Sequence, residues 1–129
     1  MNGREWVVEA FGCESERLCN SDILRAMFNA IIADLSLNPV GVSQWHTFPA
    51  PGGVTGMCML AESHLTVHTF PEHGSLCLDL FCCTPREPWA WSAKLAEHVG
   101  ASHVVVRVLE RGYGGVGAGT GAPAGSSVL

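Results

Sequence analysis

The apolar residues of this chain fall into short segments, each bounded by Gly, Pro or small polar residues. Two segments have helical spacing: residues 23–35, with Ser21 and Asp22 as candidate N-caps, and residues 89–99, which Gly100 closes. A chain divided into such short pieces buries its apolar side chains only by stacking helices and strands in layers.

The remaining apolar segments are rich in β-branched and aromatic residues or alternate with polar ones, which favours strands. One begins at Val54, is interrupted by a small polar cluster at residues 61–64, and then alternates with Leu65 and Val67 on one face. The others cover residues 6–11, 40–48, 76–83 and 103–109. The order β-α-β-β-β-α-β predicts an α+β fold, a two-layer sandwich with a mainly antiparallel sheet and helices on one face. Because such a sheet leaves its other face uncovered, we expect a homodimer.

The length of 129 residues suits one domain, and we expect that domain to occupy residues 1–111. Residues 112–129 contain seven of the 15 glycines and no charged side chain, which predicts a flexible tail. A largely disordered chain is excluded, because 47% of the residues are hydrophobic and only 15% are charged.

The charge pattern limits the possible partners. The formal net charge is −5 and no run of Lys or Arg occurs, so the basic surface of a nucleic-acid or anionic-membrane binder is missing. No uncharged apolar run reaches the ~18 residues of a membrane span. Residues 1–6 also lack the basic-then-apolar layout of a signal peptide. We therefore expect a cytoplasmic protein that binds neither nucleic acid nor membranes.

Six cysteines in a chain without secretory features predict free thiols rather than a disulfide framework. Cys58 and Cys77 lie inside apolar segments, where a thiol behaves as a small hydrophobic side chain. The sequence has no CxxC pair, which argues against a zinc ribbon. We expect most of the cysteines to fill the core and one to have a chemical role.

Polar and reactive side chains concentrate between Thr55 and Cys83, and three interpretations of them are open. They are ordinary strand and turn residues of a binding module, a metal site, or a set that includes a catalytic nucleophile. A metal site is disfavoured, because His64 and His68 on one strand are about 13 Å apart. The candidate nucleophiles and bases are Ser63, His68 and Cys83.

The central sequence resembles a known enzyme family. Residues 61–72 read AESHLTVHTFPE and residues 78–83 read LDLFCC. This pair of blocks is similar to the ESH-(L/I)-(T/S)-(I/V)-HT-(W/F)-PE and D-(V/L)-F-x-C blocks of the small, pyruvoyl-dependent, self-cleaving prokaryotic S-adenosylmethionine decarboxylases. The likeness extends over residues 5–112, through the flanking segments VEAFGC, HTF, GVTG and ERG.

The resemblance implies that the chain cleaves itself. The hydroxyl of Ser63 would attack the carbonyl of Glu62, convert the peptide bond to an ester, and leave a β chain of residues 1–62 and an α chain of residues 63–129. Ser63 would become a covalent pyruvoyl group, the only cofactor implied, and no metal is expected. By the same resemblance His68 is the proton acceptor in processing and Thr55 supports it. The residue types suit the reaction, because it needs a strained turn at the serine and a neutral imidazole nearby.

The resemblance also implies the roles of further residues in decarboxylation. The substrate amine would form a Schiff base with the pyruvoyl carbonyl, and Cys83 would return a proton to the substrate after carbon dioxide leaves. Glu72 would hold the ribose hydroxyls and Phe48 would stack on adenine. Alternation along the strand points Cys82 to the opposite face, and we interpret His64 as a structural member of the motif. The product of the reaction would be the aminopropyl donor for spermidine synthesis.

The sequence departs from the family pattern near the expected substrate pocket. The stretch from His46 to Thr55 is one residue longer than in typical members, with the insertion at residues 49–53, and Phe70 and His73 replace commoner Trp and Tyr. Two alternatives therefore stay open. One is a pyruvoyl-dependent arginine or ornithine decarboxylase of the same family, and the other, of another class, is a processing-dead binding or scaffold protein.

Overall fold

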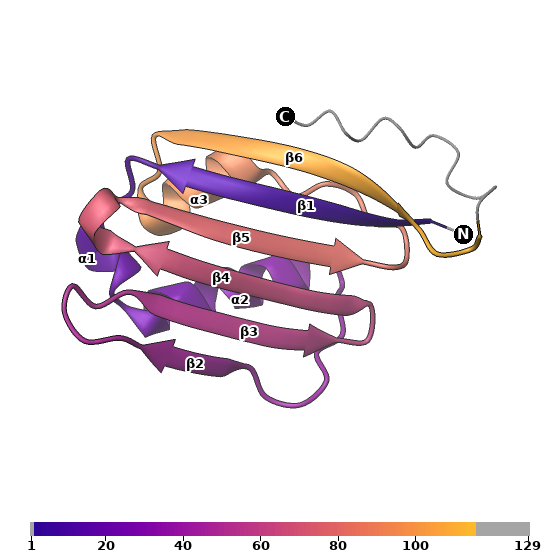
Figure 1. Cartoon of the computed structure of the whole chain (residues 1–129), viewed down its shortest axis with the longest axis horizontal. Helices are drawn as coiled ribbons and strands as arrows, with labels where there is room; N and C mark the ends of the chain where they lie inside the picture. The colour runs from indigo at the N-terminus through magenta and orange to yellow at the C-terminus, as the bar shows by residue number, and fades with distance from the viewer. Residues whose placement is uncertain (1, 116–129) are drawn as a thin grey trace.

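A six-stranded antiparallel sheet organises the chain, and the computed structural model describes residues 2–115 of it (Figure 1). The strand order across the sheet is β2-β3-β4-β5-β1-β6. The strands are β1 (Asn2–Phe11), β2 (Gln44–Thr47), β3 (Val54–Leu60), β4 (Ser63–Phe70), β5 (Ser75–Cys82) and β6 (His103–Gly112). The helices are α1 (Ser15–Leu18), α2 (Ser21–Asp34), α3 (Trp91–Val99) and the 3-10 turn η1 (Pro71–His73).

The helices lie on one face of the sheet, and the core fills the space between the two layers (Figure 1). Alternate strand residues point into this space, so their side chains are buried while their neighbours are not. The α2 helix packs its apolar side onto them through Leu24, Met27, Phe28 and Ile31. The predicted α+β sandwich is therefore confirmed.

The expected order of elements was one strand short. Four strands, not three, lie between α2 and α3, because the chain reverses at Ala61 and Glu62 and pairs β3 with β4. The polar cluster that interrupted the apolar pattern is thus a two-residue hairpin turn. The predicted strand at residues 40–48 is shorter in the structure, since Gly41 has a φ of 76° and β2 begins only at Gln44.

The start of α2 also differs from its prediction. Neither Ser21 nor Asp22 caps the helix. Asn20 does so, with its side-chain oxygen accepting hydrogen bonds from the backbone N–H groups of Asp22 and Ile23. The four-residue helix α1 was missed because it is too short to show helical periodicity, and α3 begins at Trp91 rather than Trp89.

The C-terminal boundary lies slightly beyond residue 111. Gly112 belongs to β6, and the hydroxyl of Tyr113 donates a hydrogen bond of 2.6 Å to the backbone carbonyl of Cys83. The rest of the predicted tail, residues 116–129, lies outside the described residues.

The sheet face opposite the helices is open over residues 2–115, and we call it the open face (Figure 1). It presents Met57 and Met59 from β3, both at least half exposed, beside polar side chains from β4 and β5. Cys77 also lies there and is exposed, so its prediction as a buried hydrophobic side chain was wrong, whereas Cys58 is buried as expected. Within the described residues no helix is both long enough and apolar enough to cross a membrane.

Candidate active site

The hairpin turn between β3 and β4 places Ser63 at the start of a strand in an unusual backbone conformation. Its φ is 152°, a value that residues with a side chain rarely adopt. The preceding residue, Glu62, is only 6% exposed, and its backbone carbonyl accepts a hydrogen bond of 2.9 Å from the N–H of Cys83. The carbonyl that precedes Ser63 is thus polarised by a donor from the end of β5.

A chain of polar contacts runs from Ser63 across the open face. The Ser63 hydroxyl lies 3.2 Å from Nδ1 of His64, and Nε2 of His64 lies 2.9 Å from Oδ2 of Asp79. The carboxyl group of Asp79 also interacts with that of Glu5, which accepts a 2.6 Å hydrogen bond from Arg111. Four strands, β4, β5, β1 and β6, each contribute one or more of these side chains because they are neighbours in the sheet.

The carboxyl groups of Asp79 and Glu5 have pKa values that are shifted in opposite directions. Burial raises the pKa of Asp79 to about 6, and the hydrogen bond and charge of Glu5 add to this more than His64 opposes it. Burial acts in the same direction on Glu5, but its hydrogen bonds with Asp79 and Arg111 outweigh burial and lower its pKa. Asp79 therefore holds the proton first as the pH falls and is a carboxylate above about pH 6.

The buried side chain of Glu62 is held by a second set of contacts on the helix side. Its carboxylate accepts hydrogen bonds from the backbone N–H of Asn38 at 3.0 Å, from the Asn38 side chain at 2.5 Å, and from Arg86 at 3.0 Å. Burial raises the pKa of this carboxyl, but the Asn38 hydrogen bonds and the Arg86 charge outweigh burial and lower it. Glu62 is thus an anchored anion rather than an exposed turn residue.

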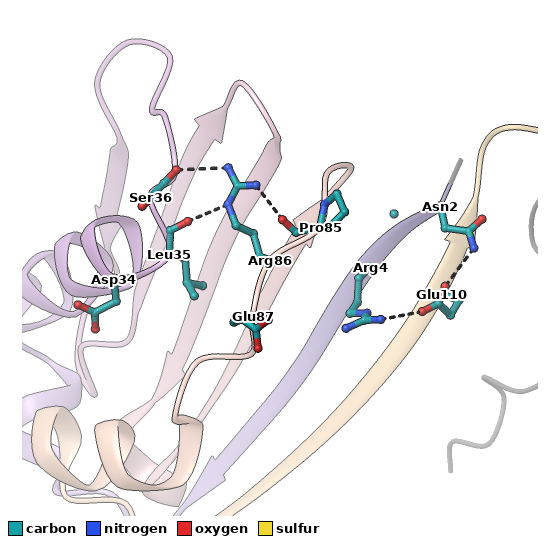
Figure 2. Close-up of a pocket in the computed structure, with 10 residues that line it drawn as sticks. Asn2, Arg4, Asp34, Leu35, Ser36, Pro85, Arg86, Glu87 and Glu110 are labelled. Carbon is teal, nitrogen blue, oxygen red and sulfur yellow. Dashed lines mark hydrogen bonds and ion pairs between the residues drawn. The ribbon is translucent and has the colours of Figure 1, made fainter.

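Arg86 connects Glu62 to the wall of the largest described cavity, of about 740 Å³ (Figure 2). Its guanidinium also donates to the backbone carbonyls of Leu35, Ser36 and Pro85, as Figure 2 shows. Arg4 and Glu110 form an ion pair at the opposite side of the cavity. Because the guanidinium of Arg86 is already hydrogen-bonded to the protein, we assign no ligand to this cavity. Its connection to the site is the contact of Arg86 with Glu62.

The remaining predicted residues gather at the other end of the β3–β4 hairpin. The hydroxyl of Thr55 lies 3.1 Å from Nδ1 of His68 on the paired strand. Both line a cavity of about 360 Å³ together with Phe48, Phe70 and Glu72. The inserted prolines at residues 49 and 51 form part of its wall, so the insertion shapes this cavity directly.

The predicted site residues therefore form two groups within one chain. Glu62, Ser63 and Cys83 lie at the hairpin turn, whereas Thr55, His68, Glu72 and Phe48 lie around the 360 Å³ cavity. His68 follows Ser63 by five residue steps of extended strand, which is about 16 Å. The side chain of His68 cannot reach Ser63 of its own chain across that distance.

The two adjacent cysteines occupy opposite faces, as alternation predicts. Cys82 is fully buried, and burial raises the pKa of its thiol to about 11. Cys83 is partly exposed and follows the last residue of β5, beside the carbonyl of Glu62. Of the two thiols, only Cys83 is placed to contact a molecule at the turn.

Sequence reasoning missed several residues of the turn. His64 was interpreted as structural, yet it is the imidazole that contacts Ser63. Asp79 belongs to the D-L-F block, and pairing β4 with β5 would have placed it beside His64. Nothing in the spacing indicates Asn38 or Arg86. Within residues 2–115, no three His, Cys, Asp or Glu side chains are arranged to hold a metal ion.

A strained serine, an imidazole, a polarised carbonyl and a partly exposed thiol meet at the β3–β4 turn, and these are groups that an enzyme active site uses. A family model described as S-adenosylmethionine decarboxylase matches residues 4–112. The chain belongs to the S-adenosylmethionine decarboxylase family and is a decarboxylase.

Named relatives agree with this assignment. The S-adenosylmethionine decarboxylase proenzyme of Caldicellulosiruptor saccharolyticus is 34% identical over 85% of this chain and 88% of the relative. That of Shouchella clausii is 35% identical over 88% of both chains. The crystal structure of the adenosylmethionine decarboxylase from Aquifex aeolicus shares the fold, with a TM-score of 0.72 and 24% identity over 85% of this chain and 90% of that one.

Proposed function

We propose that this chain is a pyruvoyl-dependent S-adenosylmethionine decarboxylase that cleaves itself between Glu62 and Ser63. The observation that carries the proposal is the Glu62–Ser63 peptide bond itself. It lies at a strained turn, its carbonyl accepts a hydrogen bond, and the hydroxyl of Ser63 is in contact with an imidazole. Attack by this hydroxyl on the preceding carbonyl closes a five-membered ring, so the reaction is intramolecular and needs no second molecule as nucleophile.

The residues at the turn fit the cofactor that the reaction would make. The pyruvoyl group would be formed from Ser63 and would supply an electron sink for the carbon–carbon bond that breaks in decarboxylation. Cys83 is the partly exposed thiol at the same turn and would donate a proton to the product. The product would serve as the aminopropyl donor for spermidine synthesis.

We further propose that the active enzyme is a homodimer that joins the two groups of site residues. The turn of one chain would meet the 360 Å³ cavity of its partner, since about 16 Å separates Ser63 from His68 within a chain. The open face is the surface that would pair, because it carries both groups and exposes Met57 and Met59 between them. In the joined site Glu72 would hold the ribose and Phe48 would stack on adenine.

Two measurements test the proposed function. Intact mass of the purified protein is expected to show fragments of residues 1–62 and 63–129, and a chain that never splits would reject the proposal. Release of carbon dioxide is then compared for S-adenosylmethionine, arginine and ornithine at equal concentrations. We expect turnover of S-adenosylmethionine, and activity confined to arginine or ornithine would reject the proposed substrate while retaining the pyruvoyl mechanism.

A further inference from the structure

We propose that His64 is the general base for the first step of self-cleavage and that Asp79 holds it in the tautomer this step requires. The inference rests on the proposed function and adds a residue for which the sequence motif implied no chemical role. It assigns to one chain the nucleophile, the base and the polarised carbonyl that take part in converting the peptide bond into an ester.

The contact between nucleophile and base is already formed. The Ser63 hydroxyl oxygen and His64 Nδ1 are 3.2 Å apart, which is within hydrogen-bond reach. Among residues 2–115, His64 carries the only imidazole hydrogen-bonded to this hydroxyl. His68, the other imidazole on β4, is instead in contact with Thr55 at the far end of the hairpin.

The second ring nitrogen determines which tautomer His64 adopts. Nε2 lies 2.9 Å from Oδ2 of Asp79, and a carboxylate can only accept a hydrogen bond. The proton of the neutral ring is therefore on Nε2, which leaves the lone pair of Nδ1 facing the Ser63 hydroxyl. Asp79 is thus a positioning residue, since it acts on the serine only through the ring of His64.

The electrophile is prepared by the same turn. The carbonyl oxygen of Glu62 accepts the N–H of Cys83 at 2.9 Å, and this is the oxygen on which negative charge develops when the carbonyl is attacked. Asn38 and Arg86 hold the side chain of the same residue, so Glu62 is anchored through both its carboxylate and its carbonyl. The φ of 152° at Ser63 adds strain that is relieved when the peptide bond is lost.

The step balances within this set of groups. Nδ1 of His64 removes the hydroxyl proton as the Ser63 oxygen bonds to the carbonyl carbon of Glu62. The cyclic intermediate then collapses by breaking the bond between that carbon and the nitrogen of Ser63. Protonated His64 returns its proton to this nitrogen, which becomes an amine. The products are an ester and a free amino group, and the imidazole is neutral again.

Cleavage of the ester is a separate reaction, because a base must remove the α-proton of Ser63 to expel the Glu62 carboxylate. In the proposed homodimer that base is His68 of the partner subunit. Two imidazoles would therefore serve two consecutive steps. His64 makes the ester inside one chain, and His68 eliminates it across the interface.

Hydroxylamine distinguishes the two steps, because it cleaves an ester and leaves a peptide bond intact. Freshly prepared His64→Ala, His68→Ala and Asp79→Asn variants are incubated with and without hydroxylamine, and their masses are followed over time. His103→Ala is the control, since His103 is an exposed imidazole at the start of β6. Circular dichroism confirms that each variant is folded before it is compared.

We expect His64→Ala to form ester about 10²-fold more slowly or worse, so that hydroxylamine releases no residue 1–62 fragment. Asp79→Asn should slow ester formation at least tenfold through the wrong tautomer. His68→Ala should accumulate ester that hydroxylamine cleaves after Glu62, and His103→Ala should behave like the wild type.

A folded His64→Ala that splits within threefold of the wild-type rate, or that accumulates hydroxylamine-labile ester, overturns the role of His64 as base. An Asp79→Asn variant that forms ester at the wild-type rate overturns the positioning role of Asp79. Failure of the proposed function has a different signature. In that case the wild-type chain itself stays whole, and the inference is rejected with it.

Discussion

At the scale of single residues, Glu62 has two roles: its side chain stabilises the turn, and its carbonyl belongs to the peptide bond that is proposed to break. Its carboxylate is buried and paired with Arg86 and Asn38, while its backbone carbonyl accepts a hydrogen bond from the N–H of Cys83. Burial of a carboxylate costs free energy unless its charge is paired. The contacts with Arg86 and Asn38 are therefore needed to keep the side chain of Glu62 buried at the turn. The same residue therefore anchors the peptide bond that is proposed to break.

Loss of the Arg86 side chain should destabilise the uncleaved protein. In a Ser63→Ala background, which prevents processing, Arg86→Ala leaves the Glu62 charge buried without its cation and should cost about 3 kcal/mol in the free energy of unfolding. Urea unfolding at fixed protein concentration measures this. Arg4→Ala is the matched control, because its ion pair with Glu110 is exposed and should contribute less than about 1 kcal/mol. Equal costs for the two variants would contradict the anchored state of Glu62.

The stability of the same precursor should depend on pH through Glu62. The pKa of this carboxyl is lowered in the folded protein, so its ionised form contributes stability above the ordinary value of 4.5. That contribution is lost as the pH falls through the lowered pKa. Between pH 6 and pH 3 the Ser63→Ala parent should therefore lose more stability in urea unfolding than a Glu62→Gln variant of it. Glu16→Gln, which alters an exposed carboxylate of α1, should follow the parent. Parallel curves for parent and Glu62→Gln would refute the shift.

At the scale of elements, the β3–β4 hairpin holds the two groups of site residues at its opposite ends. Its turn carries Ser63, and its open end carries Thr55 and His68 in register. Each strand is only seven or eight residues long, yet this length is enough to keep the two groups of site residues apart. The hairpin thus keeps Ser63 and His68 apart within one chain, which is why the proposed site needs two chains.

The start of α2 gives a direct test of element boundaries. Asn20→Ala removes the side chain that caps the helix and should destabilise the protein by about 1 kcal/mol. Ser21→Ala should change the free energy of unfolding by less than half as much, because Ser21 lies inside the first turn and makes no capping hydrogen bond. Both are measured by urea unfolding in the Ser63→Ala background. The reverse order of the two effects would place the cap where the sequence alone suggested it.

Local patterns predicted the fold class because alternation and helical spacing are properties of neighbouring residues. They located the alternation at Leu65 and Val67 and the apolar side of α2, and the structure brings two residues of the motif, Ser63 and Cys83, to the same turn. They could not predict the contact between Glu5 and Arg111, which are 106 residues apart, or that between Arg86 and Glu62. Both contacts depend on which strands and loops become neighbours. The burial of Glu62 could not be predicted for a related reason, since its partners Asn38 and Arg86 come from distant loops.

At the scale of the whole molecule, the proposed homodimer makes a prediction that no single chain can satisfy. A Ser63→Ala chain and a His68→Ala chain, made together with distinguishable tags, form mixed dimers. The His68→Ala chain keeps its own Ser63 and would receive His68 from its partner, so it should split in the mixed dimer. Intact mass of the separated tags reports which chain is cleaved.

Each variant expressed alone supplies the control for this experiment, because neither homodimer contains a site with both Ser63 and His68. We expect both to remain uncleaved. A His68→Ala chain that stays whole in a verified mixed dimer would show that the two groups of residues do not meet across the interface.

The strand order has a further consequence for what a break after Glu62 does to the molecule. β1 belongs to the first 62 residues, but it lies between β5 and β6, which belong to the rest of the chain. The two products of processing would therefore be interleaved in one sheet, with residues 4–10 of one product paired on both sides with strands of the other. They could separate only if the sheet unfolded. Cleavage would therefore change one residue chemically and leave both products in a single folded domain.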